Sequence, residues 1–282
     1  MNPVLDGYRL VTPGSLREVF EELSSHPAAR PFAGGTDLMV MLESGALPPG
    51  HYVGLANCAE LRAIEETSDG VVIGALTTYT DILRSDLVRR KYGMLAIAAS
   101  ETGGVPTQNR GTIGGNIANA SPAADTPPAL LAYDATLELM SASGSRRLPY
   151  ADFHRGYRRM DLGPDELIAR IHLPRRASGW RDYYRKVGTR RAQAISKVCF
   201  AGAIRMDGTT IADVRIALGS VAPTVIRARG TEAALRNRPV TAESIASAER
   251  SLASEIAPID DLRSTARYRT RVACNLMRAF LS

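Results

Sequence analysis

The first 58 residues alternate between helical spacing of apolar side chains and short apolar runs. A helix is predicted where apolar residues recur three and four positions apart, at Leu16, Val19, Phe20 and Leu23. Ser15 is a good N-cap for this helix, with Glu18 three residues later as in a capping box. A second helix is predicted over 37–45, and two short strands over 31–33 and 53–55. This order of elements predicts a small parallel α/β unit.

The pattern changes from about residue 59. Asp69 and Gly70 lie between two strand-like runs and predict a hairpin. Helical character over 81–102 ends at a pair of glycines, which are typical of a helix C-terminus. Two further strands are predicted over 135–142 and 165–174.

The last third of the chain begins with strands and ends with helices. Strand-like runs occupy 180–188, 194–208 and 210–221, and helical spacing follows over 241–256 and near the C-terminus. The segment 174–179, which contains a proline, two arginines and a glycine, is the best candidate linker.

These patterns together predict an α+β protein of two domains. The first domain is expected over 1–176, with subdomains of about 1–58 and 59–176. The second is expected over 177–282 and combines a sheet with helices. A chain of 282 residues is long enough to bury a substantial core in each.

Composition narrows the class of protein. The three cysteines, Cys58, Cys199 and Cys274, are far apart and form no CxxC pair, which argues against disulfides, an iron–sulfur cluster or a structural zinc site in this chain. We therefore expect the protein to be located in the reducing cytoplasm. No apolar run approaches the roughly 20 residues that span a bilayer, so no membrane span is expected.

A first glycine loop is a candidate for ligand binding. It consists of a strand that runs into paired glycines and a helix start, Pro31, Phe32, Ala33, Gly34, Gly35, Thr36, Asp37 and Leu38. Without a Cβ, backbone N–H groups at glycines can approach an anion, and a helix N-terminus favours negative charge. The same residues would also suit a purely structural turn between strand and helix.

A second glycine loop lies about 80 residues downstream. Its candidate binding residues are Thr112, Ile113, Gly114, Gly115, Asn116 and Asn119, with Asp125 at a following helix start. The loop offers backbone donors and amide side chains beside two apolar isoleucines, and Asp125 could accept hydrogen bonds from a sugar or ribityl hydroxyl. Neither loop is a P-loop or a GxGxxG fingerprint. Two such loops on adjoining subdomains favour an extended diphosphate held between them.

Other candidate chemistry is sparse. The histidines, which lack metal-ligand spacing such as HExxH, are His26, His51, His154 and His172. There is no GxSxG motif and no close carboxylate pair in a glycine-rich context. We therefore expect no catalytic side chain and no metal site, and any redox chemistry would come from a cofactor.

At the two glycine loops the sequence closely resembles the FAD-binding medium subunit of molybdenum hydroxylases, the xanthine dehydrogenase and carbon monoxide dehydrogenase family. The matching motifs are 33–38 and 112–116 followed by 119–125, in the family's order and spacing. Downstream, 165–174 resembles the strand that brings an apolar side chain to the flavin, and 184–190 resembles the segment that supplies a lysine.

The resemblance implies a vanillyl-alcohol-oxidase-type (PCMH-type) FAD-binding domain of two α/β subdomains. It also implies a C-terminal α+β domain with a three-stranded sheet and helices. By the same resemblance, both glycine loops surround the flavin and its diphosphate, and Asn119 and Asp125 bind polar parts of FAD. Ile168 would pack on a ring, and Lys186 would approach the cofactor from the second domain.

The resemblance also implies partners. Thr36 stands where some flavoproteins of the wider superfamily attach FAD through a histidine, so non-covalent FAD is expected. The molybdenum cofactor would lie on a large subunit and [2Fe–2S] clusters on a small subunit. Electrons would pass from those clusters through FAD to an external acceptor.

Two alternatives compete with this interpretation. A stand-alone FAD-dependent reductase of the UDP-N-acetylenolpyruvoylglucosamine reductase type shares a similar loop pair, but needs a proton donor that the sequence does not suggest. A nucleic-acid binder is suggested by the net charge of +6 and by basic residues at Arg175, Arg176, Arg181, Arg185, Lys186, Arg190 and Arg191. An interface with an acidic partner subunit explains those residues equally well, and we expect no nucleic acid.

Overall fold

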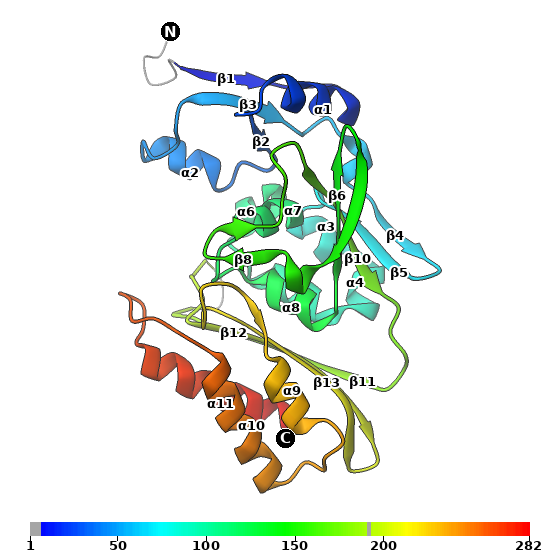
Figure 1. Ribbon diagram of the computed structural model, residues 1–282, viewed down its shortest axis with the longest axis vertical. Coiled ribbons are helices and arrows are strands. Elements are labelled where there is room, and N and C mark those ends of the chain that lie inside the picture. The colour runs from blue at the N-terminus through cyan, green and yellow to red at the C-terminus, as the bar shows by residue number, and fades with distance from the viewer. Residues whose placement is uncertain (1–6, 191–192) are drawn as a thin grey trace.

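The computed structural model describes residues 7–190 and 193–282, so Arg191 of the basic cluster lies outside the described residues. Three parts are stacked along the long axis, with the N-terminal sheet at one end and the C-terminal helices at the other (Figure 1). No helix in the described part of the chain is long and apolar enough to cross a membrane.

The N-terminal part is the parallel α/β unit that the sequence predicts. Its elements are β1 (Tyr8–Val11), α1 (Leu16–Ser25), β2 (Arg30–Phe32), α2 (Leu38–Glu43) and β3 (Gly50–Gly54). The central strand β3 pairs in parallel with β1 and β2. The Ser15 hydroxyl caps α1 by accepting from the Glu18 N–H, as expected. The Glu18 carboxylate, however, accepts from the Gly14 N–H, one residue before the position of a reciprocal capping box.

The central part combines an antiparallel sheet with a layer of short helices. The sheet has the order β4-β5-β10-β6-β7. Its strands, and the small β8–β9 pair beside them, are β4 (Ile64–Thr67), β5 (Gly70–Gly74), β6 (Thr136–Ser141), β7 (Gly144–Pro149), β8 (His154–Gly156), β9 (Arg159–Met160) and β10 (Leu167–Pro174). The hairpin predicted at Asp69 and Gly70 is present with its turn one residue earlier, at Ser68 and Asp69, since Gly70 already pairs with Thr67. Short 3₁₀ turns occur at Ala59–Leu61 and Tyr150–Asp152.

The predicted helix over 81–102 is wrong as a single element. The helical layer consists of α3 (Tyr79–Arg84), α4 (Asp86–Lys91), α5 (Gly93–Glu101), α6 (Val105–Arg110), α7 (Ile113–Ala118) and α8 (Thr126–Ala132). Ser85 has extended backbone and its hydroxyl accepts from the Val88 N–H, so it ends α3 and caps α4. Tyr92 separates α4 from α5, and its buried hydroxyl donates to the carbonyls of Leu173 and Pro174.

The C-terminal part is a sheet covered by helices. Its elements are β11 (Trp180–Val187), β12 (Val198–Asp207), β13 (Thr210–Gly219), β14 (Ile226–Arg227), α9 (Arg229–Leu235), α10 (Ala242–Glu255) and α11 (Ala266–Leu281). The three long antiparallel strands follow the expected pattern, and β14 adds a two-residue edge to β13. The short helix α9 was not predicted from the sequence.

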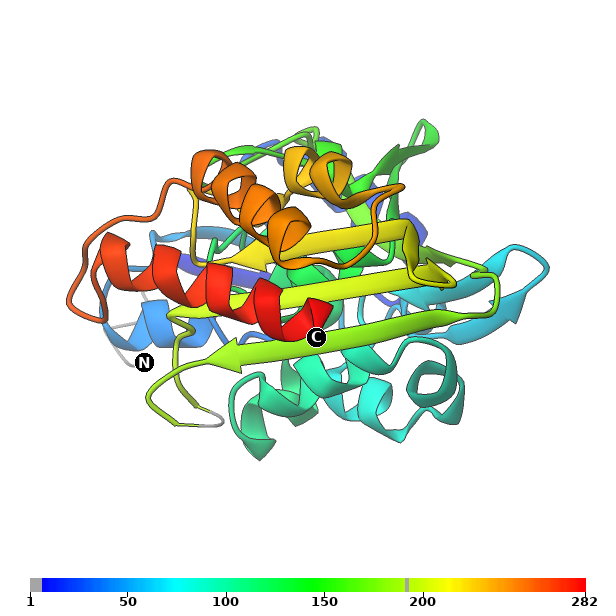
Figure 2. The ribbon, with the colours of Figure 1, turned by 90° about the horizontal axis from the view of Figure 1, so that it is seen from below.

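Both faces of this C-terminal sheet are buried. Helices α9, α10 and α11 cover one face (Figure 2). Val198, Phe200 and Ile204 belong to the hydrophobic core between this face and the helices. The alternate positions Ala201 and Ala203 belong to the core shared with the central part. The period of two along β12 thus separates two cores, and small side chains allow α8 to approach the sheet closely.

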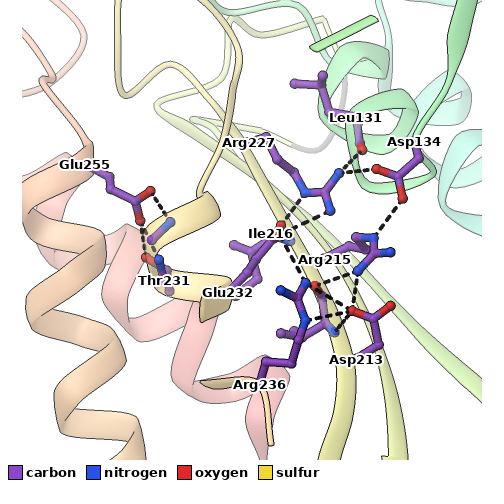
Figure 3. A network of polar contacts seen from close by, with 12 residues as sticks. Leu131, Asp134, Asp213, Arg215, Ile216, Arg227, Thr231, Glu232, Arg236 and Glu255 are labelled. Atoms are coloured by element: carbon purple, nitrogen blue, oxygen red, sulfur yellow. Dashed lines mark hydrogen bonds and ion pairs between the residues drawn. The ribbon is translucent and has the colours of Figure 1, made fainter. Parts of the chain in front are cut away.

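Charged side chains also connect the end of α8 to the C-terminal sheet (Figure 3). Arg227 donates to the Leu131 carbonyl at 3.0 Å and pairs with Asp134 and Glu232. Arg215 pairs with Asp134 at 2.7 Å and with Asp213. This network fixes the C-terminal sheet against the central helical layer.

Candidate functional site

The candidate site is a cleft of about 480 Å³ between the N-terminal sheet and the helical layer of the central part. Both glycine loops and the start of β10 form its walls. The predicted binding residues that line it are Pro31, Ala33, Gly34, Gly35, Thr36, Asp37, Leu38, Thr112, Gly114, Gly115, Asn116, Asn119 and Ile168. The structure therefore brings together two segments that are about 80 residues apart in the chain.

The first loop presents unused backbone donors. Among the described residues, no acceptor is found for the N–H groups of residues 34–38, which connect β2 to α2. Gly35 has φ +75°, a conformation that favours glycine, and a Cβ there would lie 2.6 Å from the Phe32 ring. A row of free N–H groups at the start of a helix is suited to a phosphate or diphosphate.

The second loop contributes side chains rather than backbone donors. The N–H groups of Ile113 and Gly114 donate to the carbonyls of Thr77 and Ala75, and that of Gly115 donates to the Thr112 hydroxyl. The expectation that this loop offers free backbone donors is therefore wrong at these positions. The Asn116 Oδ1 accepts from Thr126 at 2.7 Å, which leaves the amide NH₂ group available as a donor at the cleft wall.

Two glycines allow close contact between elements. A Cβ on Gly34 would lie 1.9 Å from the Arg110 carbonyl oxygen, so this position joins the first loop to the end of α6. A Cβ on Gly114 would lie 2.5 Å from the Ala75 Cβ, so α7 packs directly on the chain after β5. Glycine is required at both positions by packing, whether or not a ligand is bound.

The deep part of the cleft is apolar. Its additional lining residues, which the sequence did not single out, include Leu55, Leu61, Leu76, Leu167 and Tyr79. The pairing of β10 with β6 shifts register between Ile168 and Arg170, and the intervening Ala169 carbonyl accepts from the Ala75 N–H. Such bulges re-aim neighbouring side chains, here beside the cleft. An apolar floor beside a row of backbone N–H donors suited to an anion fits a flavin ring joined to a diphosphate.

Of the three ionisable groups among the described residues that line the cleft, Asp37 lies in the first glycine loop, and the other two, Glu166 and Tyr79, are poorly placed for proton transfer. The Glu166 carboxylate accepts from Arg146 at 2.7 and 2.8 Å and from the Gly163 N–H at 2.7 Å, and these hydrogen bonds, that of Arg146 foremost, lower its pKa. Burial raises the pKa of Tyr79 well above its usual value. The first is therefore a fixed anion and the second a neutral phenol near neutral pH.

Four of the predicted binding residues lie behind the cleft wall. Phe32 packs beneath Gly35, and Ile113 is fully buried in the core. Asp125 and Lys186 pair with each other, Oδ2 to Nζ, at 2.7 Å. Contact of these four with a cofactor stays a prediction, and in this structure each side chain is engaged elsewhere.

The Asp125–Lys186 pair is nearly sealed from solvent. The Lys186 ammonium also donates to the Glu101 carbonyl at 2.8 Å. Burial raises the pKa of Asp125 to about 6, although the Lys186 ammonium opposes the rise. Asp125 occupies the N-cap position of α8 without capping it, because its Oδ2 is directed to Lys186. Its Oδ1 is buried without a hydrogen-bond partner among the described residues.

Comparison with known proteins identifies the family. A sequence profile described as an FAD binding domain in molybdopterin dehydrogenase matches residues 6–176, and one described as a CO dehydrogenase flavoprotein C-terminal domain matches residues 183–282. The chain belongs to the FAD-binding medium subunits of the molybdenum hydroxylase family. It is accordingly a flavoprotein subunit of an oxidoreductase, with FAD as its cofactor.

Relatives of this medium-subunit family match along nearly the whole chain. The glyceraldehyde dehydrogenase medium chain of Sulfolobus acidocaldarius is 36% identical over 267 residues, which cover 94% of each protein. The carbon monoxide dehydrogenase medium chain of Hydrogenophaga pseudoflava is 32% identical and covers 90% of this chain and 88% of the relative. A solved structure of carbon monoxide dehydrogenase from the same organism matches with a TM-score of 0.93 at 32% identity, over 96% of this chain and 95% of that one. The α+β fold class with two FAD-binding subdomains and a C-terminal domain is confirmed.

The basic cluster is largely engaged within the subunit. Lys186 is paired with Asp125, and Arg176 pairs with Asp182 at 2.8 Å. Arg181 donates to the Phe280 carbonyl at 2.6 Å. Lys186 and Arg176 thus connect the two domains and Arg181 fixes β11 to α11, which weakens the sequence-based case for a nucleic-acid surface.

Proposed function

We propose that this chain is the electron-transfer subunit of a molybdenum hydroxylase, and that it passes electrons from [2Fe–2S] clusters of a small partner subunit through FAD to an external acceptor. A large subunit would carry the molybdenum cofactor and the substrate. Bound FAD supplies the ability to exchange electrons one or two at a time, which no side chain offers.

The observation that carries this proposal is the composition of the cleft. Free backbone donors of residues 34–38 stand at one end and an apolar floor at the other. Neither Glu166 nor Tyr79 is poised to donate or accept a proton near neutral pH. A cleft of this kind holds and orients a flavin but is poorly equipped for acid–base chemistry on a substrate.

This chain's own residues would act by position. The 34–38 N–H groups would hold the diphosphate, Asn116 and Asn119 would donate to polar atoms, and Ile168 would pack against the ring. Position 36 holds threonine rather than a histidine that could form a covalent bond to the flavin, so FAD would be bound non-covalently. We place the domain boundary near residue 176, between β10 and β11. Lys186 then belongs to the second domain and would act on the site through its ion pair with Asp125.

The stand-alone reductase is not favoured. The relatives that match this chain are named as medium chains or FAD-binding subunits of larger dehydrogenases. A reductase of that type would also need a proton donor in the cleft, where Glu166 is held as an anion by Arg146. We further propose that the protein acts in the cytoplasm and that an external carrier accepts its electrons.

The test is to isolate the chain from its native cells through an affinity tag. The proposal predicts that a larger and a smaller chain co-purify, with molybdenum and iron in fixed ratio to FAD, and that the separated flavoprotein retains FAD but neither metal. It also predicts that photoreduced flavoprotein, mixed anaerobically with the oxidised partner chains, reduces their iron–sulfur absorbance. Turnover of a nicotinamide and UDP-N-acetylenolpyruvoylglucosamine by the isolated chain would instead establish the reductase.

A further inference from the structure

A cluster of ligand-type side chains lies outside the cleft, where α1 packs on the N-terminal sheet. Glu22 and His26 are one turn apart on α1, and His51 comes from β3. The Glu22 Oε2 lies 3.3 Å from the His26 Nδ1 and 3.4 Å from the His51 Nε2. All three ligand atoms lie within 4.8 Å of one another.

Two of these atoms are buried without a hydrogen-bond partner. Among the described residues, neither the Glu22 Oε2 nor the His51 Nε2 has one, although they face each other. The His51 side chain is 12% exposed and that of Glu22 30%. A buried polar atom without a partner costs free energy, so this arrangement lacks a group that would satisfy both atoms.

The two distances from the Glu22 carboxylate oxygen to the imidazole nitrogens match the edge of a metal coordination polyhedron. Zinc–nitrogen and zinc–oxygen distances of about 2.0–2.2 Å at a tetrahedral angle place neighbouring ligand atoms roughly 3.3–3.5 Å apart. The two measured distances to the Glu22 Oε2 are 3.3 and 3.4 Å. The imidazole rings of His26 and His51 lie edge to face with centroids 4.3 Å apart, and their ligand nitrogens lie within 4.8 Å of each other and of the Glu22 oxygen.

We propose that Glu22, His26 and His51 bind a divalent transition metal of the Zn²⁺ class, with water at the remaining position. Two imidazoles and one carboxylate favour Zn²⁺ or Co²⁺ over Mg²⁺ and Ca²⁺, which prefer sites made of oxygen. The His26 Nδ1 also lies 3.3 Å from the Glu22 carbonyl oxygen, a contact that metal binding would replace.

The surroundings of His51 bear on its readiness as a ligand. Burial, foremost, and the nearby His26 and Arg9 lower the pKa of His51, while Glu22 opposes this. A neutral imidazole is the form that binds metal. Arg9, which is paired with His51 across β1 and β3, would moderate the affinity by repelling the cation.

The site would fasten α1 to the sheet that carries the first glycine loop. Strand β3 lies between β1 and β2, and β2 leads directly into residues 34–38. The sequence did not reveal the cluster because His51 is 25 residues beyond His26 and joins it only through the parallel pairing. The inference is independent of the electron-transfer role.

The test uses the full chain after treatment with a chelator, in buffer that contains millimolar Mg²⁺. Titration with Co²⁺ should give one saturable equivalent by calorimetry, with visible d–d absorption of four-coordinate intensity, and Zn²⁺ should displace it. Glu22→Gln and His51→Gln should each weaken Co²⁺ binding at least tenfold. The matched control Glu21→Gln, on the exposed neighbouring position of α1, should bind as the wild type does.

Retained flavin absorbance and an unchanged melting temperature without metal would show that the variants are folded. Absence of a saturable Co²⁺ equivalent in the wild type would overturn the proposal. Equal Co²⁺ affinity in Glu22→Gln, His51→Gln and Glu21→Gln would also overturn it, because the metal would then bind elsewhere.

Discussion

Lys186 and Asp125 form a buried ion pair across the boundary between the two domains, with Nζ 2.7 Å from Oδ2. Lys186 lies on β11 and Asp125 directly precedes α8, and only 2% of the lysine side chain is exposed. The second hydrogen bond of the ammonium, to the Glu101 carbonyl, adds the end of α5. The charge that the family resemblance assigns to the flavin is thus neutralised by Asp125 in this structure.

Replacement of Lys186 by methionine should destabilise the protein by about 3 kcal/mol, because it leaves the Asp125 carboxylate buried without its partner. The adjacent Arg185→Met is the control, since Arg185 is exposed and has no ion pair among the described residues. The double variant Lys186→Met with Asp125→Asn should recover part of the loss. Urea unfolding measures all four proteins, and equal costs for the two methionine variants would contradict this account.

The pH dependence of stability should carry the signature of Asp125. Its pKa in the folded protein is about 6, against about 3.9 in an unfolded chain. The folded protein therefore holds this proton between about pH 4 and 6 when the unfolded chain has released it. The stabilising contribution is complete below about pH 4 and is lost as the pH rises through about 6, with a size of about 3 kcal/mol.

Asp125→Asn removes this titration. The wild type should therefore lose about 2 kcal/mol of unfolding free energy relative to Asp125→Asn between pH 4 and pH 7, because part of the full effect already falls below pH 4. Urea unfolding at intermediate pH values gives the curve. A constant difference between the two proteins across this range would show that Asp125 titrates normally.

Gly34→Ala should separate the two glycine loops. The added Cβ would lie 1.9 Å from the Arg110 carbonyl oxygen, which belongs to the backbone and has little room to move. We expect at least a tenfold loss of FAD affinity and destabilisation of about 2 kcal/mol or more. Gly93→Ala is the control, because a Cβ there meets nothing within 4 Å. Flavin fluorescence titration would detect the loss, and wild-type affinity in Gly34→Ala would exclude close packing of the loops.

Arg227 should be the most sensitive position of the interdomain network (Figure 3). Its removal leaves Glu232, whose side chain is 4% exposed, without its closest cation and frees the Leu131 carbonyl. We expect Arg227→Ala to cost about 3 kcal/mol. Arg227→Lys should restore little, because one ammonium cannot replace a planar guanidinium that bonds three groups. Full rescue by lysine in urea unfolding would show that charge alone matters.

The sequence predicted those structural features that depend only on residues close together in the chain. The Ser15 cap and the 69–70 hairpin depend on residues a few positions apart, and both are present. Both glycine loops were found from composition and line one cleft. The breaks at Ser85 and Tyr92 were missed, since the Tyr92 hydroxyl is fixed by carbonyls more than 80 residues away.

Pairing between distant segments limited the prediction of the site. Nothing local shows that the N–H groups of Ile113 and Gly114 donate to the carbonyls of Thr77 and Ala75. Likewise, Lys186 finds Asp125 61 positions away. In this structure the N–H groups of Ile113 and Gly114 and the Lys186 ammonium are therefore engaged by groups of the protein itself.

The visible absorption spectrum of the purified chain, with identification of the chromophore released on denaturation, tests the central claim most directly. The account predicts a two-band flavin spectrum and full release of FAD, because Thr36 offers no histidyl link and the cleft binds by donors and packing. A folded chain that is colourless and takes up no added FAD would contradict the account and leave the glycine loops as structural turns.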